Sequence, residues 1–173
     1  GLPSVAIGQG YQNQPDGCAK IGVGRCTKCC NKSLAGCPPK AADIVEFLKE
    51  NPVQYLATVG RDGKAKCRPF MFCFEKDGKL WFCTNNQKDV YKDMQANPEI
   101  EISVSSPEYA WIRLAGKAVF ENNMEVKEGC MNNPIVKGQY QTADNPIFEV
   151  FYLENVHAVI ADFSGNPPKE YSC

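Results

Sequence analysis

The stretch Lys66–Ala96 constrains the fold most strongly, because it combines two strands, a tight turn and a helix in direct succession. Residues 66–74 and 80–84 are rich in aromatic and other apolar side chains, and the dipeptide Asp77-Gly78 between them is typical of a hairpin turn. Both strands carry apolar side chains on both faces, whereas a half-exposed hairpin would alternate more cleanly. The sequence therefore predicts a hairpin covered on both sides, by a barrel interior on one and by a helix or a second subunit on the other.

Alternation along the first strand predicts which of its side chains share a face. The first face holds an arginine and three phenylalanines: Arg68, Phe70, Phe72 and Phe74. The second face holds smaller or more flexible side chains: Cys67, Pro69, Met71 and Cys73.

Arg68 is the only charged residue within this apolar pair of faces, and it points to an anion. The neighbouring strand ends at Thr84 and Asn85 and leads into a helix whose first turn holds Lys88. A cation at the positive end of a helix dipole is unfavourable by a few tenths of a kcal/mol unless an anion is nearby. Arginine, hydroxyl, free backbone N–H groups and lysine together suit a phosphate. The alternative is an edge arginine, a helix cap and a solvated lysine.

The remaining chain divides into two parts of different character. Residues 41–173 contain six or seven short strands with helices only at the connections, which favours a mainly β fold built as a small barrel. Residues 1–40 are rich in Gly, Pro, Gln, Asn and Cys and show little apolar periodicity, so they predict an irregular extension that needs a metal, a staple or a host surface. The first residue is Gly1 rather than Met, so we allow for a leader removed before it.

Charge and cysteine usage limit the partners and the compartment. Nineteen basic and twenty acidic residues give a net charge of −1, which excludes the strong basic character expected of nucleic-acid or anionic-membrane partners. No apolar run approaches the roughly 18 residues of a membrane span. Cys67, Cys73 and Cys83 lie inside expected strands, where free thiols behave as small hydrophobes. This pattern favours a reducing, cytoplasmic setting over a secreted disulfide scaffold.

Half of the ten cysteines fall within twenty residues of the N-terminal extension: Cys18, Cys26, Cys29, Cys30 and Cys37. The Cys26–Cys29 pair can grip one metal or one corner of a cluster, because two intervening residues let both sulfurs converge. Cys37 is followed by proline, as is the last ligand of a ferredoxin-type run, although the gaps here are longer. Cys18, Cys26, Cys29 and Cys37 are the expected ligands, with Cys30 able to replace Cys29. An iron–sulfur centre such as [4Fe–4S], a structural zinc, and disulfides or free thiols remain alternatives.

The order of motifs in residues 41–173 resembles the pyridoxamine 5′-phosphate oxidase-like FMN-binding split barrels. The segments that carry the resemblance are FLKENPVQYLATVGRDGKAKCRPF, DGKLWFCTNNQKDVYKDM, AWIRLAGKAVF and AVIADFSGNPPKEY. Within that superfamily the chain is most similar to the small branch with nitroimidazole-reductase-type flavoproteins. The resemblance implies a homodimer with two FMN sites at its interface, which agrees with the doubly covered hairpin.

The resemblance also implies roles for individual residues. Arg68 and Lys88 would hold the FMN phosphate, assisted by Thr84 and Asn85. The isoalloxazine ring would lie along two residues of the same strand and near a tryptophan from the partner subunit: Pro69, Phe70 and Trp111.

Departures from the family narrow the expected function. The chain ends in GNPPKEYSC, without the basic, histidine-containing motif that binds substrate phosphate in pyridoxamine-phosphate oxidases proper, which argues against that substrate. His157 is the only histidine, and a lone strand histidine is usually structural, so we assign no catalytic residue. The leading hypothesis is an FMN-dependent oxidoreductase or electron-transfer protein whose N-terminal iron–sulfur centre exchanges electrons with FMN and with a redox partner or small-molecule acceptor. The alternative is a non-catalytic flavin-binding module with a structural zinc clip. The superfamily's other ligands, a deazaflavin and haem, also remain possible.

Overall fold

The computed structural model describes residues 5–7, 21–23, 33–34 and 41–172, and the chain divides into two compact units, Gly1–Lys40 and Ala41–Cys173. In the first unit, three short strands form a parallel sheet in the order β1-β2-β3: β1 (Val5–Ile7), β2 (Ile21–Val23) and β3 (Ser33–Leu34). The four cysteines expected to bind a cluster or zinc, Cys18, Cys26, Cys29 and Cys37, lie outside the described residues.

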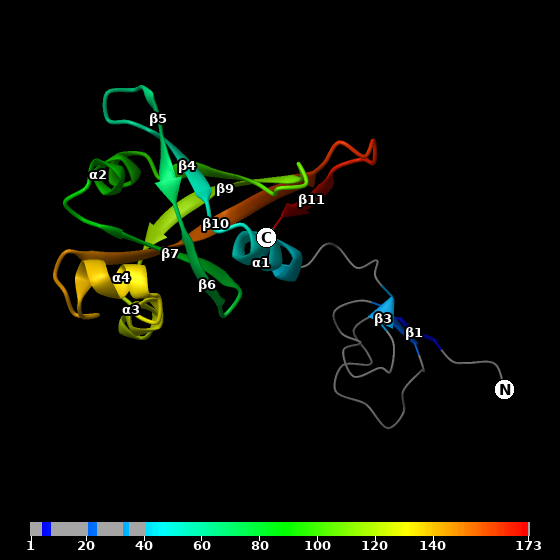
Figure 1. Ribbon diagram of the computed structural model, residues 1–173, viewed down its shortest axis with the longest axis horizontal. Coiled ribbons are helices and arrows are strands. Elements are labelled where there is room, and N and C mark those ends of the chain that lie inside the picture. Colours follow the sequence, from blue (N-terminus) through cyan, green and yellow to red (C-terminus); the bar gives the residue numbers. More distant parts are fainter. Residues whose placement is uncertain (1–4, 8–20, 24–32, 35–40, 173) are drawn as a thin grey trace. The chain divides into compact units, whose positions relative to one another are not determined.

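The second unit is a curled antiparallel sheet with four short helices (Figure 1). Its strands are β4 (Gln54–Val59), β5 (Ala65–Phe70), β6 (Phe72–Lys76), β7 (Lys79–Asn85), β8 (Glu99–Ser105), β9 (Trp111–Phe120), β10 (Phe148–Ala161) and β11 (Lys169–Ser172). Its helices are α1 (Ala41–Glu50), α2 (Asp89–Ala96), α3 (Met124–Cys130) and α4 (Pro134–Tyr140). The strand order is β5-β4-β8-β9-β10-β7-β6, with β11 paired to β10. The predicted mainly β split barrel is confirmed, with eight strands in place of six or seven.

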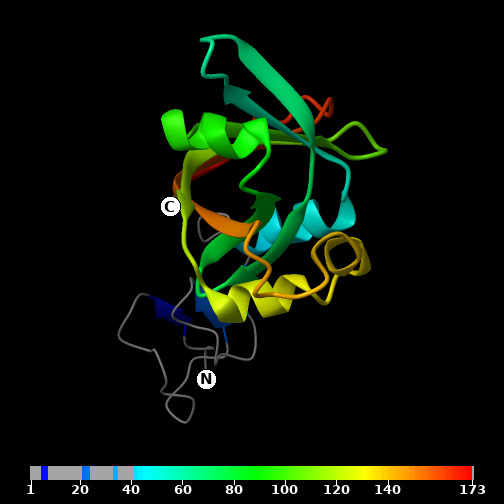
Figure 2. The ribbon, with the colours of Figure 1, turned by 90° about the vertical axis from the view of Figure 1, so that its left-hand side faces the viewer.

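Two consecutive strands, β5 and β6, connect the two edges of this sheet and curl it into a barrel. β5 and β6 are separated only by Met71, yet β5 pairs with β4 at one end of the strand order and β6 pairs with β7 at the other. The two edges of the sheet are therefore joined by nearly continuous extended chain, as Figure 2 shows from the side. The expected first strand of the hairpin is thus two strands that belong to opposite edges.

The hairpin turn itself lies where the sequence places it. Asp77 and Gly78 have φ angles of 55° and 78°, the left-handed values that a two-residue turn with the sheet's own twist requires. Lys76 pairs with Lys79, and the register is regular until a shift between Phe72 and Phe74.

Two apolar layers cover the hairpin, as predicted. The barrel interior is one layer, centred on Leu56, Phe82, Ile102, Leu114 and Phe151, all with 0% exposed surface. The second layer lies between the sheet and helices α3 and α4, and its buried members are Trp81, Val126, Cys130, Val136, Tyr140, Phe148, Val150 and Tyr152. Helices of this chain therefore cover the outer side. Among the described residues, no helix is long and apolar enough to cross a bilayer.

A β-bulge corrects one predicted face. Because the register shifts between Phe72 and Phe74, Phe74 pairs with Trp81 and packs in the outer layer beside Cys73, whereas Phe72 pairs with Phe82 in the interior. Two residues of the bulged strand oppose one on its partner, so strict alternation fails there. The prediction that Phe74 shares a face with Phe72 was wrong.

Candidate functional site

A groove lies beside the junction of β5 and β6. It has a volume of about 360 Å³ and is lined by residues from β5, β7, the start of α2 and α4, here called the Pro69 groove: Pro52, Val53, Pro69, Phe70, Met71, Cys83, Lys88, Ile135, Val136, Gln139 and Tyr140. Three of the residues predicted from the sequence, Pro69, Phe70 and Lys88, are thereby brought together. The lining is mostly apolar with one cation, which suits a planar ligand that carries an anionic group.

Arg68 points to the barrel side, where neutral oxygens hold it in place. Its Nη1 atom donates to Thr58 Oγ1 at 2.7 Å and to the Leu56 carbonyl at 3.3 Å. Among the described residues, neither Arg68 nor Lys88 forms an ion pair with a carboxylate. The Arg68 charge contributes to lowering the pKa of Asp93 on α2, after the larger effect of Arg61, so its field reaches that helix.

The turn between β7 and α2 is organised by Asn85. Its side-chain Oδ1 accepts from the Gln87 N–H at 2.7 Å and its carbonyl accepts from the Lys88 N–H at 3.1 Å. Lys88 is the residue that precedes the first turn of α2, and its side chain makes no capping hydrogen bond. The positive end of α2 therefore has a lysine beside it rather than an acidic or hydroxyl cap.

Thr84 is the predicted site residue with a buried, unpartnered hydroxyl group. It is 2% exposed, and its Oγ1 atom has no hydrogen-bond partner among the described residues. A buried hydroxyl without a partner costs about 1–3 kcal/mol, so such groups are rare unless a bound molecule completes them.

Arg61, in the turn between β4 and β5, anchors α2. Its Nε donates to Asp93 Oδ1 at 3.0 Å and its Nη2 to Asp89 Oδ1 at 2.6 Å. Hydrogen bonds from the Arg61 backbone and side chain hold the pKa of Asp93 below its usual range. The position of α2 beside β4 is thus fixed by Arg61, which is separate from the two cations proposed to meet a ligand, Arg68 and Lys88.

Residues 41–155 match the family model described as pyridoxamine 5′-phosphate oxidase. The chain belongs to this family. Among curated proteins, no sequence matches it. It is 35% identical to a NimC/NimA family protein from Clostridium acetobutylicum, whose crystal structure superposes with a TM-score of 0.70 over 76% of this chain and 91% of that one.

More distant members of the oxidase fold share the architecture. A pyridoxamine 5′-phosphate oxidase-related, FMN-binding protein from Nostoc punctiforme is 18% identical, with a TM-score of 0.57 over 80% of this chain and 92% of that one. A haem-binding protein from Mycobacterium smegmatis is 17% identical, with a TM-score of 0.61 over 79% of this chain and 60% of that one. At these identities the likeness concerns the fold alone.

Trp111, the remaining predicted site residue of this pyridoxamine 5′-phosphate oxidase family member, lies away from the Pro69 groove. It begins β9, pairs with Ser105 and Ala161, and contacts the Phe163 ring with a centroid distance of 5.1 Å. It does not line the groove of its own chain. Its expected role near the flavin of a partner subunit therefore stays a prediction.

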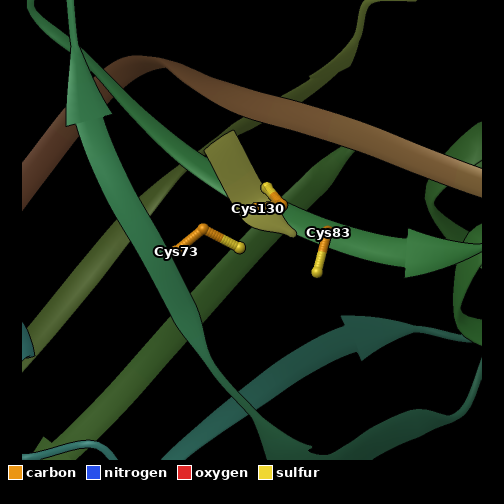
Figure 3. Close-up of side chains that lie close together, drawn as sticks. All are labelled: Cys73, Cys83 and Cys130. Carbon is orange, nitrogen blue, oxygen red and sulfur yellow. The ribbon is translucent and has the colours of Figure 1, made fainter. Parts of the chain in front are cut away.

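A second group of cysteines lies beside the groove, and for two of its members, Cys73 and Cys83, the sequence predicted only the role of small hydrophobes in strands. Cys73, Cys83 and Cys130 come together in the outer layer, with all three sulfur atoms within 4.8 Å of one another (Figure 3). Cys73 and Cys83 flank the Asp77-Gly78 turn at similar distances, which is a signal for cross-strand proximity. Nothing in the sequence indicated that Cys130 would join them.

Proposed function

We propose that this chain is an FMN-dependent redox protein that holds the FMN phosphate at the start of α2 and its ring in the Pro69 groove. Two observations carry the proposal: the cations Arg68 and Lys88 have no carboxylate partner among the described residues, and the buried hydroxyl of Thr84, at the end of β7, has no hydrogen-bond partner there. A phosphate would accept hydrogen bonds from all three. The FMN-binding character of the Nostoc punctiforme protein supports this choice of ligand.

The ring would lie along Pro69 and Phe70, with apolar side chains of α4 opposite. Ile135 lines the groove and is 70% exposed, so a ring bound there or a second subunit would cover it. Tyr140 lines the same groove, and burial raises the pKa of its phenol well above the usual value, so the phenol stays a hydrogen-bond donor.

We further propose a homodimer that completes this groove. The outward face of β4 exposes Tyr55 and Val59, at 48% and 42%, and Val53 before the strand is 64% exposed. Tyr55 pairs with Pro69 of β5, so this apolar surface continues to the groove edge. A second copy packed on this surface would bury it and bring a partner residue such as Trp111 to the ring.

FMN, when bound, supplies hydride or single-electron transfer, and the protein's residues bind it, orient it and exclude water. We assign no general acid or base. The electron acceptor would be a small molecule or a redox protein.

The N-terminal cysteines supply a separate part of the proposal. We propose that Cys18, Cys26, Cys29 and Cys37 bind an iron–sulfur centre, of the [4Fe–4S] type, that exchanges electrons with FMN; zinc on the same thiolates is the alternative. The support is the cysteine spacing alone. Iron, zinc and acid-labile sulfide analysis of protein purified without oxygen decides between them, since only the cluster contains sulfide.

The phosphate assignment is tested by comparing FMN with riboflavin, which lacks the phosphate. We expect Arg68→Ala and Lys88→Ala each to weaken FMN binding roughly 10- to 150-fold, as expected for loss of one charge-assisted contact of about 1.5–3 kcal/mol. Riboflavin affinity should hardly change. Lys92→Ala is the matched control, because Lys92 is exposed one turn further along α2. Equal losses for FMN and riboflavin, or none, would contradict the assignment.

A further inference from the structure

The three thiols of the outer layer come from three different elements. Cys73 belongs to β6, Cys83 to β7 and Cys130 is the last residue of α3, and Figure 3 shows their sulfur atoms gathered at one place. All three sulfurs lie within 4.8 Å of one another. None of these cysteines forms a disulfide in the described part of the chain.

The fold positions this group through particular local features. The β-bulge between Phe72 and Phe74 places Cys73 on the outer side, and alternation along β7 places Cys83 on that side too. Helix α3 begins at an Asn123 cap, whose Oδ1 accepts from the Val126 N–H at 3.2 Å, and it ends at Cys130. If the regular register from the turn continued beyond the Phe74–Trp81 pair, Cys73 would lie opposite Phe82 and face the barrel interior.

We propose that Cys73, Cys83 and Cys130 bind one thiophilic metal ion of the Zn²⁺ class. At a Zn–S distance of about 2.3 Å, tetrahedral thiolates lie about 3.8 Å apart, so sulfurs within 4.8 Å need to move by only about 1 Å. A disulfide, in contrast, requires a sulfur separation of about 2 Å and leaves the third thiol unused.

The group is accessible, as an ion-binding site must be. Cys73 and Cys130 line a groove of about 620 Å³ together with Phe74, Gly129, Asn132, Asn133 and Pro134, here called the Asn133 groove. Cys83 lines the Pro69 groove on the other side. These openings provide an entry path and room for a fourth ligand, as in sites where three protein ligands leave one position for water or substrate.

The site offers soft sulfur ligands, which favour soft metal ions over hard ones. Met71 lines the Pro69 groove beside Cys83, and its sulfur accepts a hydrogen bond from Asn133 Nδ2 at 3.5 Å. The nearby buried side chains are apolar or aromatic, and no Asp, Glu or His of the described residues joins the three sulfurs. Thiolate sites of this kind select zinc, copper(I) or iron over magnesium and calcium.

Neighbouring thiols and burial shift the pKa of all three cysteines. Hydrogen bonds from Cys130 and Cys73, and the Lys88 charge, hold the pKa of Cys83 well below its usual range. Hydrogen bonding to Cys130 and Cys83, with burial, raises the pKa of Cys73 well above it. The hydrogen bond to Cys73 lowers the pKa of Cys130, but Cys83 and burial raise it to about 12. Zn²⁺ binds cysteine as the thiolate, so each of the three sulfurs that is still protonated releases its proton to solvent when its metal–sulfur bond forms.

The test uses the whole 173-residue chain with the five cysteines of residues 1–40 changed to serine, so that the three-cysteine group of the barrel unit is the thiol cluster that remains. Cobalt(II) is titrated into this parent under reducing, oxygen-free conditions, and the thiolate-to-cobalt absorption is followed at wavelengths outside the flavin bands. We expect one equivalent to bind and to be displaced by Zn²⁺. Cys83→Ser and Cys130→Ser should each weaken binding at least roughly 100-fold, because even changes behind the ligands typically cost 10- to 100-fold. Cys67→Ser is the matched control, since Cys67 is an exposed thiol outside the group.

Thermal melting separates loss of a ligand from loss of the fold. Added Zn²⁺ should raise the melting temperature of the parent and of Cys67→Ser, but not that of Cys83→Ser, a half-buried position that tolerates the exchange. The proposal is overturned if the parent binds no cobalt, if Cys83→Ser binds it equally well, or if two of the three cysteines are found as a disulfide in protein kept reduced. FMN binding is not required for any of these readouts.

Discussion

The seven residues of β7 present two faces that have different roles. The inner face carries Leu80, Phe82 and Thr84 into the barrel, and the outer face presents Trp81, Cys83 and Asn85 to α3, α4 and the turn before α2. The inner face is aromatic close packing: the Phe82 ring stacks on Phe151 at 5.4 Å and meets the edge of Phe72 at 5.6 Å. The outer face is more open and holds the thiol and the polar turn. Stability therefore comes mainly from one face, and binding chemistry from the other and from the end of the strand.

The largest expected effect is on the inner face. Phe82→Ala should lower the free energy of unfolding by about 3–5 kcal/mol, because Phe82 is completely buried and its removal leaves a cavity. Cys83→Ala, on the adjacent outer position, should cost less than about 1.5 kcal/mol in metal-free protein. Urea unfolding of both variants measures the difference. Equal losses would mean that the outer face is packed as tightly as the interior.

Thr84 is where the comparison is sharpest, because it is an inner-face residue whose hydroxyl lacks a partner. Thr84→Val keeps the shape and removes the unsatisfied group, so ligand-free protein should gain up to about 1 kcal/mol of stability. The same change should weaken FMN binding several-fold, since the phosphate loses a donor. Denaturant unfolding without ligand and FMN titration measure the two effects. A destabilised variant with unchanged FMN affinity would show that the hydroxyl serves the fold.

The smallest effect concerns Asp93 of α2, the helix that follows β7. Its carboxylate accepts hydrogen bonds from Arg61, which hold the helix in place. Its pKa is lowered in the folded state by hydrogen bonds from Arg61, so its stabilising contribution is present above the unfolded pKa and is lost as the pH falls through the folded value. We expect Asp93→Asn to melt below the wild type at pH 7, with the gap narrowing below about pH 4. Melting curves across pH 3–7 test this. A gap independent of pH would contradict the charge-based account.

The sequence was informative where one residue determines local geometry, and uninformative where geometry comes from distant contacts. Asp77-Gly78 defined the hairpin, and Asn97-Pro98 marked the end of α2. The division at Met71 was not predicted, because which sheet edge each half joins depends on barrel closure rather than on local preference.

Other differences have similar causes. The polar stretch 132–145 contains helix α4, which begins at Pro134 after an Asn133 cap whose Oδ1 accepts from the Ile135 N–H at 2.9 Å. The apolar runs at residues 147–153 and 157–163 predict two strands, but they form one, β10, because the register shift between Glu154 and His157 is absorbed within the strand. Residues 164–173, which the sequence predicts to be an irregular tail, contain strand β11.

The site was predicted in parts. The residues of the turn indicated Lys88, and the family resemblance implied Pro69 and Phe70; these three residues line one groove. The three-cysteine group was not foreseen. The position of Cys73 relative to Cys83 depends on a β-bulge that the sequence does not reveal, and Cys130 follows Cys73 by more than fifty residues.

The central claim is that the Pro69 groove binds FMN, and the most direct measurement is cofactor identification on the wild-type protein. The protein is purified without oxygen, its visible spectrum is recorded, and the released cofactor is identified by mass. The account predicts a two-banded flavin spectrum, about one FMN per chain, and quenched flavin fluorescence that recovers on denaturation. A colourless protein that leaves the fluorescence of added FMN unchanged would contradict it.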